Sequence, residues 1–274
     1  MGDYLRPTSL EEALAALARP WTVLAGGTDF YPARVGRAIE DDVLDITGIA
    51  ALRGISEGPA GWRLGATTTW SELIEADLPA LFDGLKQAAR EVGGRQIQNA
   101  GTLAGNLCNA SPAADGVPPL LAMGAEVELA GRTGTRRLDL SSFIAGNRRT
   151  VLAPGELLVA IRVPRPEHPA RSAFLKLGAR RYLVISIAMA AATLEVAHGH
   201  VANARVAVGA CSAVAQRLPG LEAALAGVPL ARLAESVVPA HLAPLSPIDD
   251  VRGSAAYRRD AVVTLLRRLL RSLA

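Results

Sequence analysis

Apolar and polar positions alternate along the chain in short blocks that predict both helices and strands. Ser9 and Glu12 have the spacing of a capping box, and apolar residues then recur at helical intervals as far as Arg19-Pro20. Short apolar runs that are typical of buried strands follow, with helical patterns between them. Up to the middle of the chain we expect strands at 21–25, 43–46, 62–66, 125–130 and 156–163, and helices at 69–76, 81–92 and 117–123.

A proline-rich segment from Pro164 to Pro169 interrupts this pattern, and we place a domain boundary there, which gives domains of residues 1–166 and 167–274. Strands at 172–177, 187–196 and 204–210 and helices at 221–226 and 254–273 are expected beyond it. The middle strand is rich in alanine, so we expect it to pack closely against a neighbour. The fold class is therefore α/β or α+β.

The last predicted helix is amphipathic. Its leucines lie on one side, and its arginines lie largely on the other, at positions 258, 259, 267, 268 and 271. A core-packed helix with a solvated face is the simpler interpretation. A docking surface for an acidic partner is the alternative.

Composition narrows the class of protein. Half of the 274 residues are apolar and a fifth are charged, which is typical of a globular protein, and a net charge of +3 is too small to suggest a nucleic-acid partner. The only cysteines, Cys108 and Cys211, cannot supply a four-cysteine zinc site or an iron–sulfur cluster. We find no leader segment and no apolar run long enough to span a membrane, so we expect a cytoplasmic protein.

Two segments carry candidate chemistry, and the first is the glycine turn from Leu24 to Asp29. Glycines let the backbone approach an anion closely, and successive amides with the Thr28 hydroxyl can cradle phosphate oxygens. The turn is not a dinucleotide fingerprint, because no third glycine opens a helix at the required spacing. Taken alone, it is better explained as a tight turn without a ligand.

The second segment runs from Gln96 to Asp115 and is rich in glycine, asparagine, serine and threonine. We expect it to be a long polar loop, and such loops inside a domain are usually functional. Its amide, hydroxyl and carboxylate groups could hold a large polar cofactor. They could also satisfy the backbone of the loop itself.

Together the two segments resemble the FAD-binding chain or domain of molybdenum hydroxylases, the group of xanthine dehydrogenase and the medium subunit of carbon monoxide dehydrogenase. The resemblance rests on the Ala-Gly-Gly-Thr-Asp turn at 25–29, on the stretch from Gly101 to Asp115, and on Leu-Leu-Ala-Met-Gly-Ala-Glu-Val at 120–127. It covers nearly the whole chain. It implies that FAD contacts Val23, Leu24, Ala25, Gly26, Gly27, Thr28, Asp29, Phe30, Thr102, Gly105, Asn106, Asn109, Ser111, Asp115, Leu158 and Lys176.

The resemblance also implies the architecture and the role. The fold would be α+β: residues 1–166 would form a two-lobed FAD-binding domain of the p-cresol methylhydroxylase type, and residues 167–274 a small three-stranded sheet with helices. A partner large subunit would hold the molybdenum cofactor, and a small subunit would hold [2Fe–2S] clusters whose electrons pass to this chain's FAD and on to an external acceptor. A dimer of heterotrimers is expected, and Lys176 would stabilise reduced flavin with its positive charge.

The chain departs from the family pattern at two places. Ala104 stands where relatives often have glycine, and a positive φ there would be strained. Acidic residues that relatives often place after the arginine pair are missing after Arg181. Two other interpretations stay open: a free-standing flavin reductase of similar fold, such as the UDP-N-acetylenolpyruvoylglucosamine reductases, and an assembly subunit that has lost its cofactor.

Overall fold

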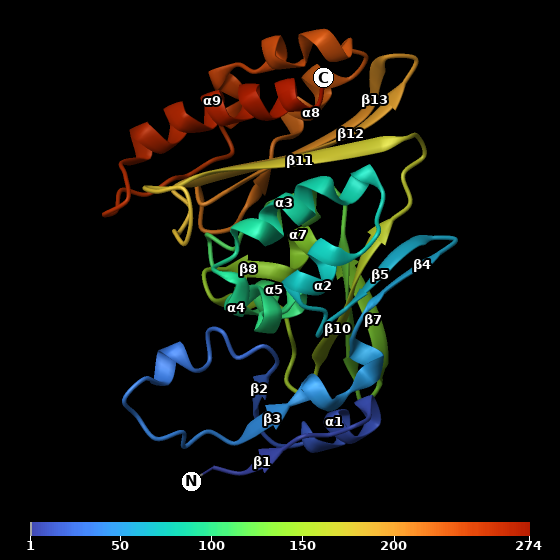
Figure 1. Ribbon diagram of the computed structural model, residues 1–274, viewed down its shortest axis with the longest axis vertical. Helices are drawn as coiled ribbons and strands as arrows, with labels where there is room; N and C mark the ends of the chain where they lie inside the picture. Colours follow the sequence, from blue (N-terminus) through green and yellow to red (C-terminus); the bar gives the residue numbers. More distant parts are fainter. Residues whose placement is uncertain (1) are drawn as a thin grey trace.

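Three lobes are stacked along the long axis of the molecule, in the order in which the chain builds them (Figure 1). The computed structural model describes residues 2–274. We call residues 2–52 the N-terminal lobe, 53–164 the middle lobe and 165–274 the C-terminal lobe. The N-terminal lobe lies at the bottom of Figure 1 and the C-terminal lobe at the top.

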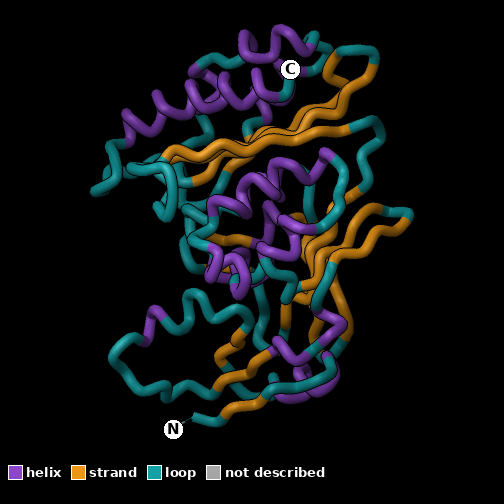
Figure 2. Tube along the Cα trace, in the orientation of Figure 1, coloured by secondary structure: helices purple, strands orange, loops and turns teal. Residues whose placement is uncertain are grey.

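The N-terminal lobe is built on a parallel three-stranded sheet with the order β1-β3-β2. Its elements are β1 (Tyr4–Leu5), α1 (Leu10–Ala16), β2 (Thr22–Leu24), the 3-10 turns η1 (Pro32–Arg34), η2 (Ile46–Gly48) and η3 (Ala50–Leu52), and β3 (Val43–Asp45). Ser9 is confirmed as the N-cap of α1, because its hydroxyl accepts from the Glu12 amide at 3.1 Å; the Glu12 carboxylate accepts from the Thr8 amide at 3.0 Å, one residue before the position of a full capping box. A long loop after β2 forms the open ring at the bottom of Figure 2.

The middle lobe is an antiparallel five-stranded sheet with the order β4-β5-β10-β6-β7 and a set of short helices. Its strands are β4 (Ile55–Gly58), β5 (Gly61–Gly65), β6 (Glu126–Gly131), β7 (Gly134–Asp139), the hairpin of β8 (Ile144–Gly146) and β9 (Arg149–Thr150), and β10 (Leu157–Pro164). Its helices are α2 (Trp70–Glu75), η4 (Ala80–Phe82), α3 (Asp83–Glu91), α4 (Arg95–Ala100), α5 (Leu103–Asn109), α6 (Val117–Ala122) and α7 (Leu140–Phe143). The fully buried Trp70, Phe82 and Phe143 belong to its core.

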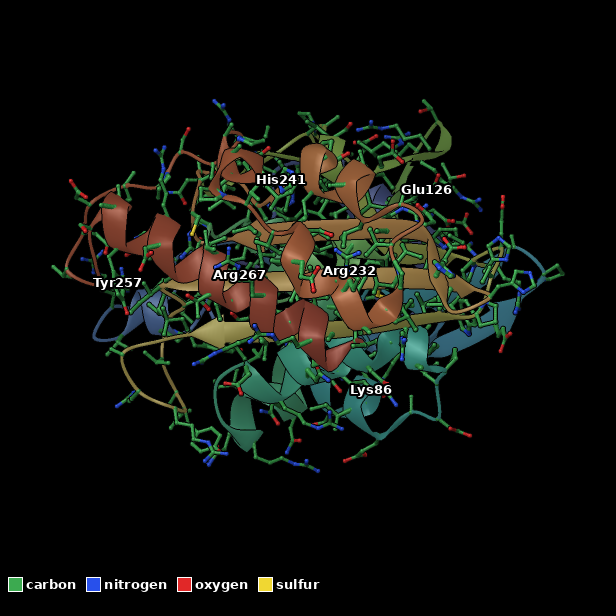
Figure 3. The ribbon with its side chains drawn as sticks, turned by 90° about the horizontal axis from the view of Figure 1, so that it is seen from above. Lys86, Glu126, Arg232, His241, Tyr257 and Arg267 are labelled. Carbon is green, nitrogen blue, oxygen red and sulfur yellow. The ribbon has the colours of Figure 1, made fainter. Side chains whose placement is uncertain are left out.

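The C-terminal lobe is an antiparallel sheet covered by helices. Its elements are β11 (Ala170–Leu177), β12 (Ala188–Ala197), β13 (His200–Gly209), β14 (Gln216–Arg217), α8 (Pro219–Leu225), η5 (Leu230–Ser236), η6 (Pro239–Leu242) and α9 (Ala255–Ser272). In the view from above, α9 lies along the outer face of this sheet, with Tyr257 near one end and Arg267 farther along (Figure 3). The inner face of the sheet packs on α3 and α6 of the middle lobe.

Strand β12 is buried on both faces, as its alanine content indicated. Ala190 and Ala192 face the core under α8 and α9, whereas Met189 and Ala191 face Ala88 and its neighbours on the middle lobe. Small side chains let helices approach the sheet from both sides. The neighbouring edge of β11 is covered by α3 as well, because the Gly84 amide donates to the Ser172 hydroxyl and the Phe174 amide donates to the side-chain oxygen of Gln87.

Three expectations need correction. The segment from Gln96 to Asp115 is not one loop, because it contains α4 and α5, whose apolar residues Leu103 and Leu107 are fully buried. The C-terminal sheet gains a fourth, two-residue strand, β14, which pairs with β13. The remaining unforeseen strands are short or at sheet edges: β1, β4, β7, β8 and β9.

Arg258 was expected on the solvated side of the last helix, and this was wrong. It is 2% exposed. Its guanidinium donates to the carbonyl oxygens of Ile187 and Ala210 and to the Asp250 carboxylate, so tertiary partners replace water. Among residues 2–274, no helix is long and apolar enough to cross a bilayer.

Candidate functional site

A cavity of about 400 Å³ lies between the N-terminal and middle lobes, and both motif segments contribute to its walls. We call Val23–Phe30 the first strip and Thr102–Asp115 the second strip. The first strip begins within β2, and the second begins at the cap of α5. In Figure 1 these elements face each other across the space between the two lobes.

The glycines of the first strip let it approach the end of α4, just before the second strip begins. A Cβ at Gly26 would overlap the carbonyl oxygen of Ala100, so only glycine permits this approach. Gly27 has φ +70°, in the region that favours glycine. Within residues 2–274, the amides from Gly26 to Asp29 make no hydrogen bond, which leaves four successive donors in the cavity wall.

The loop after the first strip is held by an arginine. Arg34 binds the Asp41 carboxylate through two nitrogens at 2.7 Å and donates to the carbonyl oxygen of Phe30 at 3.0 Å. The Arg34 guanidinium lowers the pKa of Asp41 to about 2. It also lies over the Phe30 ring, 3.8 Å from its centroid. These contacts fix the end of the first strip.

The second strip is anchored to the start of α2. The Leu103 amide donates to the carbonyl oxygen of Thr68 at 3.0 Å, and Thr69 and Thr102 form an isolated antiparallel bridge. The Thr102 hydroxyl caps α5 by accepting from the Gly105 amide at 3.0 Å. Ala104 lies in the first turn of α5 with ordinary helical geometry, so its Cβ causes no strain.

Asn106 has a buried polar atom that lacks a partner. Its Oδ1 makes no hydrogen bond within the described part of the chain, and the residue lines the cavity. A buried, unsatisfied amide is costly and calls for a ligand or water. Cys108 lines the cavity and is exposed.

Three predicted contacts lie outside the cavity wall. Ser111 borders a second cavity of about 510 Å³ beside the C-terminal lobe. Asp115 and Lys176 form an ion pair at 2.7 Å, with side chains only 10% and 6% exposed. Ser186 donates to the other Asp115 oxygen at 2.7 Å. Burial raises the pKa of Asp115, against the opposing effect of the Lys176 ammonium.

The remaining predicted residues are brought together in the cavity wall: the whole first strip, Thr102, Gly105, Asn106, Asn109 and Leu158. Sequence reasoning missed other wall residues, namely Ile46, Ala66, Trp70, Val92, Ile97, Gly101, Leu152, Glu156 and Leu157. Leu157 could have been predicted from the sequence, because it adjoins Leu158 in a predicted strand. Trp70 follows Thr69 in a predicted helix, but no local pattern points it toward the glycine turn.

The wall combines free amides, a hydroxyl and an amide side chain with aliphatic and aromatic surface. Such a lining suits a large ligand that has both an anionic group and flat apolar parts. Within residues 2–274 no cluster of side chains could hold a metal ion. These donors therefore fit a dinucleotide cofactor. The main evidence is the Asn106 side-chain oxygen without a partner among residues 2–274 and the positive φ of Gly27.

Comparison with known families matches both parts of the chain. A family described as the FAD binding domain in molybdopterin dehydrogenase matches residues 1–166, and the CO dehydrogenase flavoprotein C-terminal domain family matches residues 173–273. The medium chain of carbon monoxide dehydrogenase from Afipia carboxidovorans is 33% identical, over 97% of this chain and 94% of that protein. The xanthine dehydrogenase FAD-binding subunit of Escherichia coli O157:H7 is 30% identical, over 98% and 94%.

Solved structures contain chains with the same fold. A chain of reconstituted CO dehydrogenase from Oligotropha carboxidovorans has a TM-score of 0.89 and 29% identity, with 100% of this chain and 99% of that chain covered. A chain of quinoline 2-oxidoreductase from Pseudomonas putida 86 has a TM-score of 0.85 and 26% identity, with 98% and 95% covered. These matches extend over all three lobes.

Proposed function

The chain belongs to the FAD-binding subunits of the molybdenum hydroxylases, and from that premise we propose that it carries one FAD that transfers electrons within a larger complex. The electrons come from [2Fe–2S] clusters on a small partner subunit and leave to an external acceptor. A large partner subunit holds the molybdenum cofactor and performs the hydroxylation. We further propose a dimer of such heterotrimers in the cytoplasm.

One observation carries this proposal. Among residues 2–274, four successive amides of the first strip make no hydrogen bond, and Asn106, whose buried side-chain oxygen has no partner, lines the same cavity. The cofactor's diphosphate matches the amides, because phosphate oxygens are strong acceptors for a concave run of backbone donors. The Asn106 oxygen matches a donor, such as a ribose or ribityl hydroxyl. No general acid or base is needed in this chain.

The residues of the site have distinct tasks in this proposal. The first strip binds the diphosphate, and the hydroxyl of Thr28 adds a donor beside the amides. Leu158 and its neighbours provide apolar surface for a ring system. The second strip is held in place near the cofactor by the ion pair of Asp115 with Lys176, and its Ser111 borders the second cavity. When bound, FAD supplies a carrier that exchanges electrons either singly or in pairs.

The domain division at about residue 166 is part of the proposal. Residues 1–166 supply the cavity, and residues 167–274 supply Lys176 and Ser186, which bind the end of the second strip from the other domain. The second domain thus completes the support of the second strip.

The first test is the visible absorption spectrum of the purified chain, with heat release of the chromophore and identification by mass. We expect FAD at about one per chain. A colourless chain that takes up no added FAD would favour an assembly subunit. Reduction of the bound flavin by NADPH with the isolated chain alone, and no co-purifying subunits, would favour a free-standing reductase.

The electron route needs the assembled complex. Rapid mixing of the complex with its substrate should bleach the flavin only when the [2Fe–2S] subunit is present. Flavin reduction at the same rate without that subunit would contradict the proposed route.

A further inference from the structure

The candidate cavity lacks a positively charged wall residue. Among residues 2–274, its lining includes the acidic Asp29 and Glu156 but no lysine or arginine. The diphosphate of FAD adds two negative charges to this space. Backbone amides offset part of that charge, but Asp29 lies in the first strip itself and opposes it. This inference rests on the proposed function, because FAD brings the charge.

Arg148 is a cation in contact with both strips. It lies between β8 and β9, a hairpin that contacts α5. Its Nη1 donates to the Asn109 side-chain oxygen of the second strip. The same Nη1 lies 3.8 Å from the carboxylate of Asp29 in the first strip. The guanidinium therefore stands beside both strips, at the edge of the second cavity. Among residues 2–274 its Nε and Nη2 make no hydrogen bond, so they can bind an anion.

The backbone holds Arg148 in an unusual conformation. Arg148 has φ +56°, and its amide donates at 2.9 Å to the carbonyl oxygen of Ala110, which has φ +48°. Left-handed conformations are costly for residues with a Cβ and persist where the surrounding structure enforces them. Glycine at this position would relieve the strain without supplying a charge. The arginine is thus held beside Asp29 and Asn109, two residues of the cavity wall, at an energetic cost.

We propose that Arg148 binds the diphosphate of FAD and neutralises Asp29 beside it. The Arg148 side chain is 58% exposed, so solvent weakens the interaction, and the effect on affinity is moderate. In this arrangement, one guanidinium bridges the first strip, the second strip and the cofactor. Affinity for the diphosphate then depends on ionic strength.

The test compares three ligands on the full chain freed of its flavin: FAD, ADP and adenosine. Binding of FAD is followed by quenching of its fluorescence, and binding of ADP and adenosine by displacement. We expect Arg148→Ala to weaken FAD and ADP by about tenfold, since a partly exposed charge-assisted contact is lost. Adenosine, which has no phosphate, should bind equally. The loss should shrink in about 1 M salt.

Arg149→Ala is the matched control, because Arg149 is the adjacent exposed arginine and its guanidinium contacts only the carbonyl oxygen of Ala145 among the described residues. It should bind all three ligands like the parent chain. Arg148→Gly separates charge from folding, since it should lose the same affinity while its resistance to urea is unchanged or higher. Arg148→Lys should recover part of the affinity.

The outcomes are distinct. ADP binding by both Arg148→Ala and Arg148→Gly at the parent affinity overturns the role of Arg148 and leaves the FAD site standing. An equal loss for adenosine and ADP overturns it too, since the diphosphate is then not what is recognised. A parent chain that binds neither FAD nor ADP overturns the proposed function, and the inference falls with it.

Discussion

Replacing Lys176 by methionine tests the ion pair that joins the C-terminal lobe to the second strip. The change keeps a long side chain and removes the charge. Asp115 then stays buried with Ser186 as its remaining side-chain partner. Breaking one partner of a buried pair is more damaging than removing both, because the other charge is left uncompensated.

The expected cost follows from burial. The two side chains are 6% and 10% exposed, so the general figure of about 3–5 kcal/mol for a broken buried pair applies. That is a large part of the stability of about 5–15 kcal/mol that is typical of a domain. Lys176→Met combined with Asp115→Asn should recover most of the loss, since the amide carries no charge and can still accept from Ser186.

Urea unfolding followed by tryptophan fluorescence measures both variants and their coupling. The pH dependence adds a second check. Burial raises the pKa of Asp115 in the parent chain, and loss of the ammonium raises it further. Because the protonated acid carries no unpaired charge, the deficit of Lys176→Met should be largest near about pH 8 and should shrink toward about pH 5.

A cost below about 1 kcal/mol for Lys176→Met, or a double variant that is simply additive, would refute the reasoning. A stability deficit of Lys176→Met that grows as the pH falls would also refute it, because the pH dependence would then come from a group other than Asp115. Asp115→Asn alone is the complementary control, and it should also destabilise, since it leaves the Lys176 ammonium buried beside a neutral amide.

Three further predictions concern the cavity and the C-terminal sheet. Gly27→Ala should lower the FAD content and cost about 1–2 kcal/mol, because its φ is positive and its Cβ would meet the Tyr31 ring. Gly36→Ala has a similar φ with nothing nearby, so it should cost similar stability but spare the flavin. Ala191→Leu should cost about 1–3 kcal/mol in urea unfolding, because β12 is covered on both faces, whereas Ala202→Leu at an exposed position of β13 should cost little. Burial raises the pKa of Cys211 to about 11. The Cys211 thiol should therefore react with a thiolate-specific reagent near about pH 8 at least about a hundredfold more slowly than free cysteine, and fast labelling of Cys211 would contradict this.

Local signals predicted much of the fold. The N-cap at Ser9 and the alanine-rich strand over 188–197 were visible because caps and side-chain size act over a few residues. The segment at 96–115 was misinterpreted because glycine and asparagine disfavour helices in isolation. Thr102 as a cap and Leu103 in the core outweigh that preference.

Long-range contacts limited the prediction of the site. Asp115 and Lys176 are 61 residues apart, and no periodicity indicates that they meet. The burial of Arg258 has a similar cause, since a helical wheel separates two faces but does not show the carbonyl groups that one face meets. The family resemblance selected the right segments, whereas the wall residues Trp70 and Ile97 come from packing between lobes.

Helices cover both faces of the C-terminal sheet, and this determines whether the two domains can be expressed separately. Its inner face packs on α3 and α6 through Phe174 and Met189, which a chain of residues 167–274 alone would expose to water. Residues 1–166 alone would expose the matching helices. Either half, expressed separately, should aggregate or require the other half in the same cell. Flavin loading is therefore best attempted on the intact polypeptide.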